Sequence, residues 1–193
     1  MKRLCVFCGS SLGVNSAYAE AATTLGTLLA ARGIGLVYGG GNVGLMGVIA
    51  DAALAGDGEE IGVIPRALAD REIAHTGCTE LRVVDSMHTR KAVMADLADA
   101  FVALPGGIGT LEEFFETWTW AQLGVHAKPI GLLDVAGFWG PLTGLLDHLQ
   151  AEGFLRGTPR QSLLVHGEAG VMLESLAAFT PPRVRPWLRL RET

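Results

Sequence analysis

The stretch of residues 100–116, Ala-Phe-Val-Ala-Leu-Pro-Gly-Gly-Ile-Gly-Thr-Leu-Glu-Glu-Phe-Phe-Glu, constrains the fold of this chain more than any other. Its first five residues form an apolar run that is typical of a strand buried on both faces. Four turn-forming residues follow within five positions: Pro105, Gly106, Gly107 and Gly109. From Thr110 onward, apolar residues recur at helical spacing. The stretch therefore predicts a strand, a glycine turn and a helix start, where free N–H groups favour an anion such as phosphate.

The same alternation of short apolar runs and amphipathic segments extends along the whole chain. We expect strands at about residues 3–8, 34–38, 61–64, 81–84, 100–104, 128–133 and 163–165, with helices between most of them and an irregular segment at 66–80. This order predicts an α/β fold with a doubly wound, mostly parallel sheet of about seven strands flanked by helices. We expect residues 1–179 to form one domain, followed by a proline- and arginine-rich tail, residues 180–193, that is either loosely held or docks on an acidic neighbour.

Charge and cysteine content narrow the environment of the protein. A net charge of −5 over 193 residues argues against a protein that coats nucleic acid. No apolar run reaches the roughly 18 residues needed to span a bilayer, and the N-terminus resembles a first strand rather than a signal peptide. The odd set of Cys5, Cys8 and Cys78 fits a reducing cytoplasm. Cys5 and Cys8 lie on opposite faces of the first predicted strand, which indicates a structural role rather than redox or metal chemistry.

Three glycine-rich turns follow predicted strands, at residues 9–13, 39–47 and 105–109. Ligands of a doubly wound sheet bind beyond the carboxyl ends of its strands, so the three turns together indicate a phosphate-bearing ligand. The five histidines are scattered without metal-ligand spacing, and we expect no metal site.

Two classes of protein that commonly contain such glycine turns, NAD-binding proteins and P-loop proteins, are disfavoured. Gly39, Gly41 and Gly44 match the dinucleotide fingerprint, but the next strand ends in Pro65 instead of the acid that holds a ribose hydroxyl of NAD. A P-loop would require lysine where Leu45 stands. What remains is a phosphate site with carboxylates and an arginine beside it. This set suits cleavage of a ribosyl bond, whose cationic transition state needs nearby negative charge and an oriented water.

Two blocks carry a family resemblance. Residues 105–113 match Pro-Gly-Gly-x-Gly-Thr-x-x-Glu, and residues 87–91 match Met-His-x-Arg-Lys. With further blocks at 8–11, 38–47 and 119–124, the chain resembles the LOG (Lonely Guy) family of cytokinin riboside 5′-monophosphate phosphoribohydrolases from about residue 3 to 155. Members of this family have often been mislabelled lysine decarboxylases. The resemblance implies a Rossmann-like fold, a homodimer with sites near the subunit interface, and hydrolysis without metal or cofactor. The implied products are an N6-modified adenine and ribose 5-phosphate.

Site residues follow from the resemblance position by position. Arg90 and Glu113 match the catalytic arginine and glutamate. The positions that match or adjoin substrate and phosphate contacts are Gly39, Gly40, Gly41, Glu72, Lys91, Gly106, Gly107, Ile108, Gly109, Thr110, Leu111, Glu112 and Thr119. Ile108 departs from the family, where many members carry tyrosine, and Thr89 stands where glutamate or glutamine is common.

Other functions stay open at this point. The enzyme could act on AMP or on purine nucleotides generally, with no preference for an N6 substituent. A nucleotide-binding or carrier protein without hydrolysis would need the same fold and the same phosphate turn. A lysine decarboxylase would need a lysine that forms an aldimine with pyridoxal phosphate, and Lys91 is the one plausible candidate.

Overall fold

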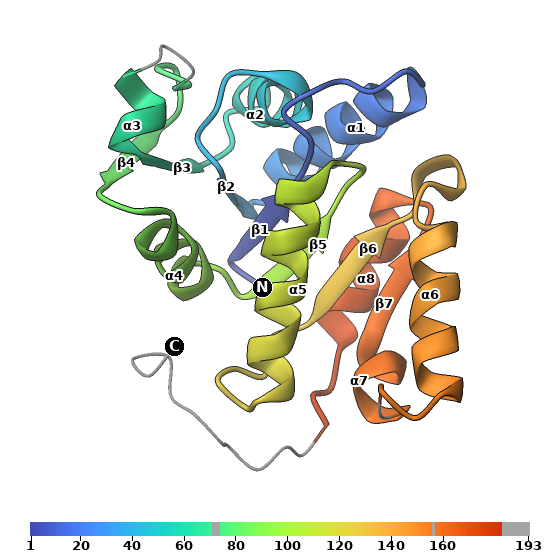
Figure 1. Ribbon diagram of the computed structural model, residues 1–193. Coiled ribbons are helices and arrows are strands. Elements are labelled where there is room, and N and C mark those ends of the chain that lie inside the picture. Colours follow the sequence, from blue (N-terminus) through green and yellow to red (C-terminus); the bar gives the residue numbers. More distant parts are fainter. Residues whose placement is uncertain (71–73, 156, 183–193) are drawn as a thin grey trace.

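A seven-stranded parallel sheet forms the centre of the computed structural model, which describes residues 1–70, 74–155 and 157–182 (Figure 1). The strands are β1 (Arg3–Phe7), β2 (Gly35–Tyr38), β3 (Glu60–Pro65), β4 (Glu80–Val84), β5 (Ala100–Ala103), β6 (Ile130–Leu133) and β7 (Leu163–His166). Their order is β4-β3-β2-β1-β5-β6-β7, and every neighbouring pair of these strands is parallel. The predicted fold class is confirmed, with a sheet that is wholly rather than mostly parallel.

Helices cover both faces of the sheet, as in a doubly wound fold (Figure 1). They are α1 (Ala17–Ala31), α2 (Gly44–Leu54), α3 (Arg66–Leu68), α4 (Met87–Leu97), α5 (Ile108–Gln122), the 3₁₀ turn η2 (Val135–Gly137), α6 (Gly140–Ala151), α7 (Gly157–Ser162) and α8 (Ala169–Ala178). Buried side chains of α1, α2 and α8 form one core with the sheet, and those of α4, α5 and α6 form the other. The helices α4 and α5 therefore share one face.

Strand β1 shows how the apolar run divides between the two cores. Leu4 and Val6 pack on the α1 side, whereas Cys5 and Phe7 pack on the α5 side. Cys8, just beyond the strand, belongs to the α1 side, so the two cysteines lie on opposite faces as expected. Both are buried free thiols. A structural role for Cys5 and Cys8 agrees with this placement.

The order of the strands creates a switch point between β1 and β5. The chain leaves β1 toward α1 on one face and leaves β5 toward α5 on the other, so the two loops diverge above the sheet. In open α/β sheets such a divergence forms the crevice in which ligands bind. The glycine turn at residues 105–109 lies at this position.

Helix α5 begins earlier than the sequence pattern predicts. The predicted start was Thr110, but the helix begins at Ile108, with Gly107 in an extended conformation as its N-cap. The Leu111 N–H donates to the Gly107 carbonyl at 3.0 Å and closes the first turn. Apolar periodicity could not mark this start, because Gly109 lies inside the first turn and carries no side chain. The early start leaves the N–H groups of Ile108, Gly109 and Thr110 without intrahelical acceptors.

Two short helices were not predicted. Helix α3 occupies three residues of the segment expected to be irregular, and α7 occupies six residues before β7. Helices of one or two turns show too little periodicity to be recognised in a sequence. The predicted contact Glu72 and the tail from residue 183 onward lie outside the described residues. Within the described ranges, no helix has the length and apolarity required to cross a membrane.

Candidate active site

The turns that follow β1, β2 and β5 contact one another above the switch point. The Gly9 N–H donates to the Pro105 carbonyl at 3.1 Å, and the Leu45 N–H donates to the Gly9 carbonyl at 2.9 Å. Gly44 has a φ of +56°, and a Cβ at this position would collide with the backbone of Ser10. This approach requires glycine, because neither the backbone angle nor the space admits a side chain. The three glycine-rich turns therefore form one contiguous surface.

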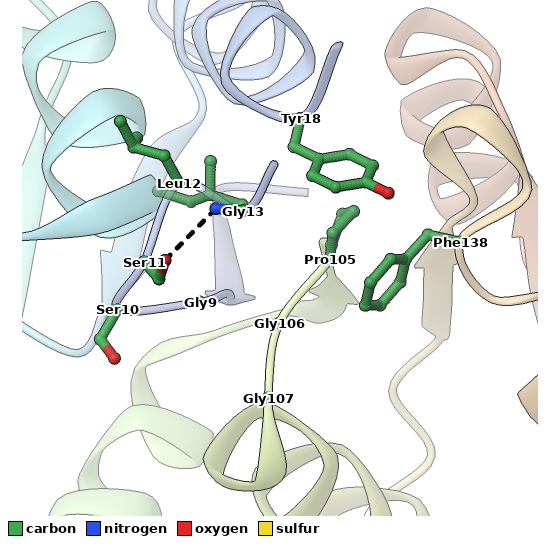
Figure 2. Close-up of a pocket in the computed structure, with 11 residues that line it drawn as sticks. Gly9, Ser10, Ser11, Leu12, Gly13, Tyr18, Pro105, Gly106, Gly107 and Phe138 are labelled. Carbon is green, nitrogen blue, oxygen red and sulfur yellow. Dashed lines mark hydrogen bonds between the residues drawn. The ribbon is translucent and has the colours of Figure 1, made fainter. Parts of the chain in front are cut away.

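A cavity of about 240 Å³ lies between the β1–α1 and β5–α5 loops (Figure 2). Its lining residues are Gly9, Ser10, Ser11, Leu12, Gly13, Tyr18, Leu45, Pro105, Gly106, Gly107 and Phe138. Tyr18 and Phe138 meet edge to face at 5.5 Å between ring centroids and form its aromatic wall. Sequence reasoning found the glycine turn but missed this wall, because no motif links Tyr18 of α1 to Phe138 after β6.

The Arg90 side chain is held in place by partners from two other segments, β3 and α5. The side chain of Ser86 caps α4 by accepting from the Thr89 N–H at 3.0 Å, which places Arg90 in the first turn. The Arg90 Nε donates to the Val63 carbonyl at 3.0 Å, and Nη1 lies 3.0 Å from Glu113 Oε1. Both side chains of the Arg90–Glu113 pair are buried. The guanidinium is thereby fixed before any ligand binds.

Burial changes the acidity of Glu113. Removal from water raises the pKa of the Glu113 carboxyl, the Arg90 charge opposes this rise, and the neighbouring Glu112 adds to it. A carboxylate that is buried from water interacts strongly with nearby charges, because little water screens the interaction. Such a group suits the stabilisation of a positive charge or the orientation of a water molecule.

A second ion-pair cluster lies beside the first. Lys91 Nζ lies 2.5 Å from Glu112 Oε1 and 2.7 Å from Glu116 Oε2, so it links α4 to α5. Burial, the largest single influence, lowers the pKa of Lys91, but hydrogen bonds and attraction from the two glutamates outweigh it. The net pKa shift is upward, and Lys91 stays a cation. All three acids in the first turns of α5 therefore face a cation: Glu113 faces Arg90, and Glu112 and Glu116 face Lys91.

Residues of the glycine turn at 105–109 and of the helix start after it differ in what surrounds them. A Cβ on Gly106 would collide with the Thr110 side chain, so Gly106 admits only a hydrogen there. Gly107 and Gly109 face open space, since a Cβ on either would meet no atom of the described residues within 4 Å. Thr110 is buried against Gly106. The open side of the helix start is therefore glycine backbone, which suits close approach by an anion.

The structure gathers some predicted site residues and separates others. Arg90, Lys91, Glu112 and Glu113 lie together through the ion pairs given above, and Gly39 lies against the Arg90 guanidinium. Three further predicted contacts have different surroundings: Gly40 packs on Ile64, Gly41 bridges to Ala74, and Leu111 packs partly against the core. Thr119 is exposed, nine residues beyond Thr110, which is about 14 Å along the helix axis. In the part of the chain that the structure describes, no group of three or more potential metal-ligating side chains gathers.

Gly39 offers a direct test of how Arg90 is placed. A Cβ on Gly39 would occupy the space of Arg90 Nη2, so Gly39→Ala is expected to displace the guanidinium from Glu113. A displacement of about 1 Å in such a site lowers a rate by about 100-fold. We expect this loss in steady-state turnover of a nucleotide substrate, with the far-ultraviolet circular dichroism spectrum unchanged. Gly144→Ala is the matched control, because Gly144 lies in α6 with open space at its Cβ position. Unaltered turnover by Gly39→Ala would contradict the placement.

Fold and site together define a Rossmann-like α/β protein with a glycine-rich helix start beside a buried Arg–Glu pair. Residues 46–176 match a family model described as "Possible lysine decarboxylase". The chain is 49% identical over 178 residues to the probable cytokinin riboside 5′-monophosphate phosphoribohydrolase LOGL1 of Oryza sativa subsp. japonica, covering 92% of this chain and 80% of that protein. It is 49% identical to the cytokinin riboside 5′-monophosphate phosphoribohydrolase LOG1 of Arabidopsis thaliana, covering 93% and 84%. The chain belongs to the LOG family.

Solved structures agree on the fold. The protein TM1055 superposes with a TM-score of 0.72 at 21% identity, over 93% of this chain and 100% of the other. The molybdenum cofactor binding protein of Rippkaea orientalis superposes with a TM-score of 0.70 at 20% identity, over 92% and 97%. At these identities the likeness concerns the fold alone.

Proposed function

We propose that the protein hydrolyses the N-glycosidic bond of N6-modified adenosine 5′-monophosphates and releases a cytokinin base and ribose 5-phosphate. The observation that carries the proposal is the buried Arg90–Glu113 pair, 3.0 Å apart, beside the start of α5. About half of the sequence is identical to LOG-family phosphoribohydrolases, which supports the same reaction. The start of α5 provides the phosphate site, and the ion pair provides charge one and a half turns further along the helix.

In the proposed reaction, the phosphate binds to the free N–H groups of Ile108, Gly109 and Thr110, with Gly106 and Gly107 leaving room for it. The turn at Gly39–Gly41 lies beside the ribose, and Lys91, Glu112, Thr119 and Glu72 are the further proposed substrate contacts. Phosphate binding energy positions the ribose over the ion pair. Since the helix start is already ordered, little of that energy is spent on arranging the site.

Bond cleavage follows from the charges at the site. The C1′–N9 bond breaks, its electron pair stays with the base, and the ribosyl carbon becomes cationic. The Glu113 carboxylate stabilises this cation and orients the attacking water, while Arg90 holds the carboxylate in position. The water oxygen then bonds to C1′, and the proton that it loses balances the one gained by the departing base.

One experiment tests the reaction and separates the alternatives. The protein is incubated with N6-isopentenyl-AMP, AMP and the two corresponding nucleosides, and released base is identified by chromatography. We expect base release from the N6-substituted monophosphate and a rate on the nucleosides lower by at least about 100-fold, because they lack the phosphate anchor. Equal rates on nucleosides and on their monophosphates would contradict the proposal that the phosphate anchors the substrate. Equal efficiency on AMP would favour a general nucleosidase, and tight AMP binding without base release would favour a carrier protein.

Lysine decarboxylation, the activity that the description of the family model suggests, has less support. An aldimine forms from a neutral amine, but Lys91 is held as a cation between Glu112 and Glu116. A free amine at this position would leave both carboxylates without their partner. The surroundings of Lys91 therefore favour a structural and electrostatic role over covalent chemistry.

We also propose that residues 1–179 work as one domain, and that the protein is a cytoplasmic homodimer. Two cores that share one sheet, from β1 to α8, support the single domain. The free thiols of Cys5, Cys8 and Cys78 support a reducing compartment. Membership of the LOG family supports the dimer, and sedimentation velocity would test it.

A further inference from the structure

The helices α4 and α5 each begin with a large exposed apolar residue. Met87 is the first residue of α4 and is 45% exposed, and Ile108 is the first residue of α5 and is 83% exposed. A single exposed apolar side chain is ordinary, but two that face each other beside a reactive site indicate a binding surface.

Ion pairs of Lys91 with Glu112 and Glu116 hold the first turns of the two helices side by side. Met87 lies four residues before Lys91, and Ile108 lies four residues before Glu112. Both helices start at the carboxyl edge of an all-parallel sheet and run in the same direction on the same face. Residues four apart lie on one side of a helix, one turn from each other. Met87 and Ile108 therefore lie one turn above the ion pair, one on each helix.

Met87 also contacts the reactive pair directly. Its Sδ lies 3.9 Å from Arg90 Nη1, the same nitrogen that lies 3.0 Å from Glu113 Oε1. The thioether thus covers the guanidinium at the side where α4 begins. A flexible, polarisable thioether adapts to flat rings and to aliphatic groups of varied shape.

We infer that Met87, with Ile108 opposite, contacts the N6 substituent of the substrate and determines the preference for an apolar group there. The inference rests on the proposed function. With phosphate at the start of α5 and C1′ above the Arg90–Glu113 pair, the base extends toward the start of α4. Its N6 edge then meets these two apolar side chains. An isopentenyl group buries apolar area between them, whereas the bare amino group of AMP does not.

The test compares two substrates in matched variants. Met87→Ala and Ile108→Ala are assayed on N6-isopentenyl-AMP and AMP, and the ratio of the two kcat/KM values is the readout. We expect the ratio to fall about tenfold in Met87→Ala and to fall in Ile108→Ala as well, because a lost apolar contact discriminates by about this factor. Met87→Leu should restore the ratio. Leu145→Ala, at a similarly exposed residue of α6, should leave it unchanged.

Other outcomes would overturn the inference. If kcat/KM falls equally for both substrates, Met87 only positions Arg90. If the variants change the sedimentation coefficient while the ratio holds, the pair belongs to a contact between subunits. If the wild-type protein releases base from both nucleotides but the ratio is insensitive to both residues, the proposed function survives and the specificity assignment fails. Release from neither substrate would remove the proposed function and this inference together.

Discussion

Glu113→Gln is expected to fold normally and to lose most of its hydrolytic activity. Glutamine keeps the shape of the side chain and an oxygen that can accept from Arg90, so the contact at 3.0 Å can persist. The negative charge is lost, and with it the stabilisation of the ribosyl cation and the orientation of water. Such groups contribute about 100- to 10,000-fold. We expect a fall of this size in kcat, with little change in KM, because the phosphate is anchored elsewhere.

The measurement is release of ribose 5-phosphate under saturating substrate, together with thermal unfolding. The unfolding midpoint should stay within about 4 °C of the wild-type value, which for a chain of this size corresponds to about 1–2 kcal/mol. Glu152→Gln is the matched control, since Glu152 is exposed at the end of α6. Undiminished turnover by Glu113→Gln would remove Glu113 from the mechanism. If the variant does not fold, Glu113→Asp, which keeps the charge but withdraws it by one methylene from Arg90, tests whether the position of the carboxylate determines kcat.

The sheet and its helices were largely predictable because local patterns determine them. The first strand is an unbroken apolar run, and its two cysteines separate onto the two faces as the alternation of strand side chains requires. The start of α5 was misplaced by two residues, because glycine carries no hydropathy signal. Helices α3 and α7 are too short for any periodic pattern.

The site was predictable in its parts but not in its geometry. The residue pattern predicted an anion at the glycine turn with carboxylates and an arginine beside it, and the resemblance singled out Arg90 and Glu113. That these two side chains touch depends on how α4 and α5 lie on the same face of the sheet, which no local pattern encodes. The same holds for the pairing of Lys91 with Glu112 and for the contact of Tyr18 with Phe138. A charged or apolar side chain has many possible long-range partners in a sequence, so the sequence alone does not select the one that it contacts.

A second buried carboxylate lies away from the site and has no such partner. Glu60 begins β3 on the α2 side of the sheet, and its side chain is fully buried. Neither carboxylate oxygen has a hydrogen-bond partner among the residues that the structure describes. Burial raises the pKa of Glu60 to about 7; the Leu54 backbone opposes the rise and the nearby Asp51 carboxylate adds to it. A proton on Glu60 therefore stabilises the folded state.

Ionisation of Glu60 lowers the stability of the folded state as the pH rises. Because the folded pKa of about 7 lies above the ordinary 4.5, the stabilisation is complete below pH 4.5 and is lost as the pH rises through 7. The difference corresponds to roughly 3 kcal/mol. His126 acts oppositely: burial lowers its pKa from 6.5 to about 4, so its stabilisation is lost as the pH falls through that range. Only a comparison of a Glu60 variant with the wild type at each pH isolates the contribution of Glu60 to the free energy of unfolding.

Glu60→Gln is expected to stabilise the protein at alkaline pH and to be nearly neutral in acid. Glutamine resembles the protonated carboxyl in shape and cannot ionise, so the variant avoids a buried charge above pH 7. From urea unfolding, we expect the variant to exceed the wild type by roughly 3 kcal/mol at pH 8.5 and to lie within about 1 kcal/mol of it at pH 5. Glu152→Gln should follow the wild type at both values. A Glu60→Gln difference that does not change between pH 5 and 8.5 would show that this carboxyl titrates equally in the folded and unfolded chains.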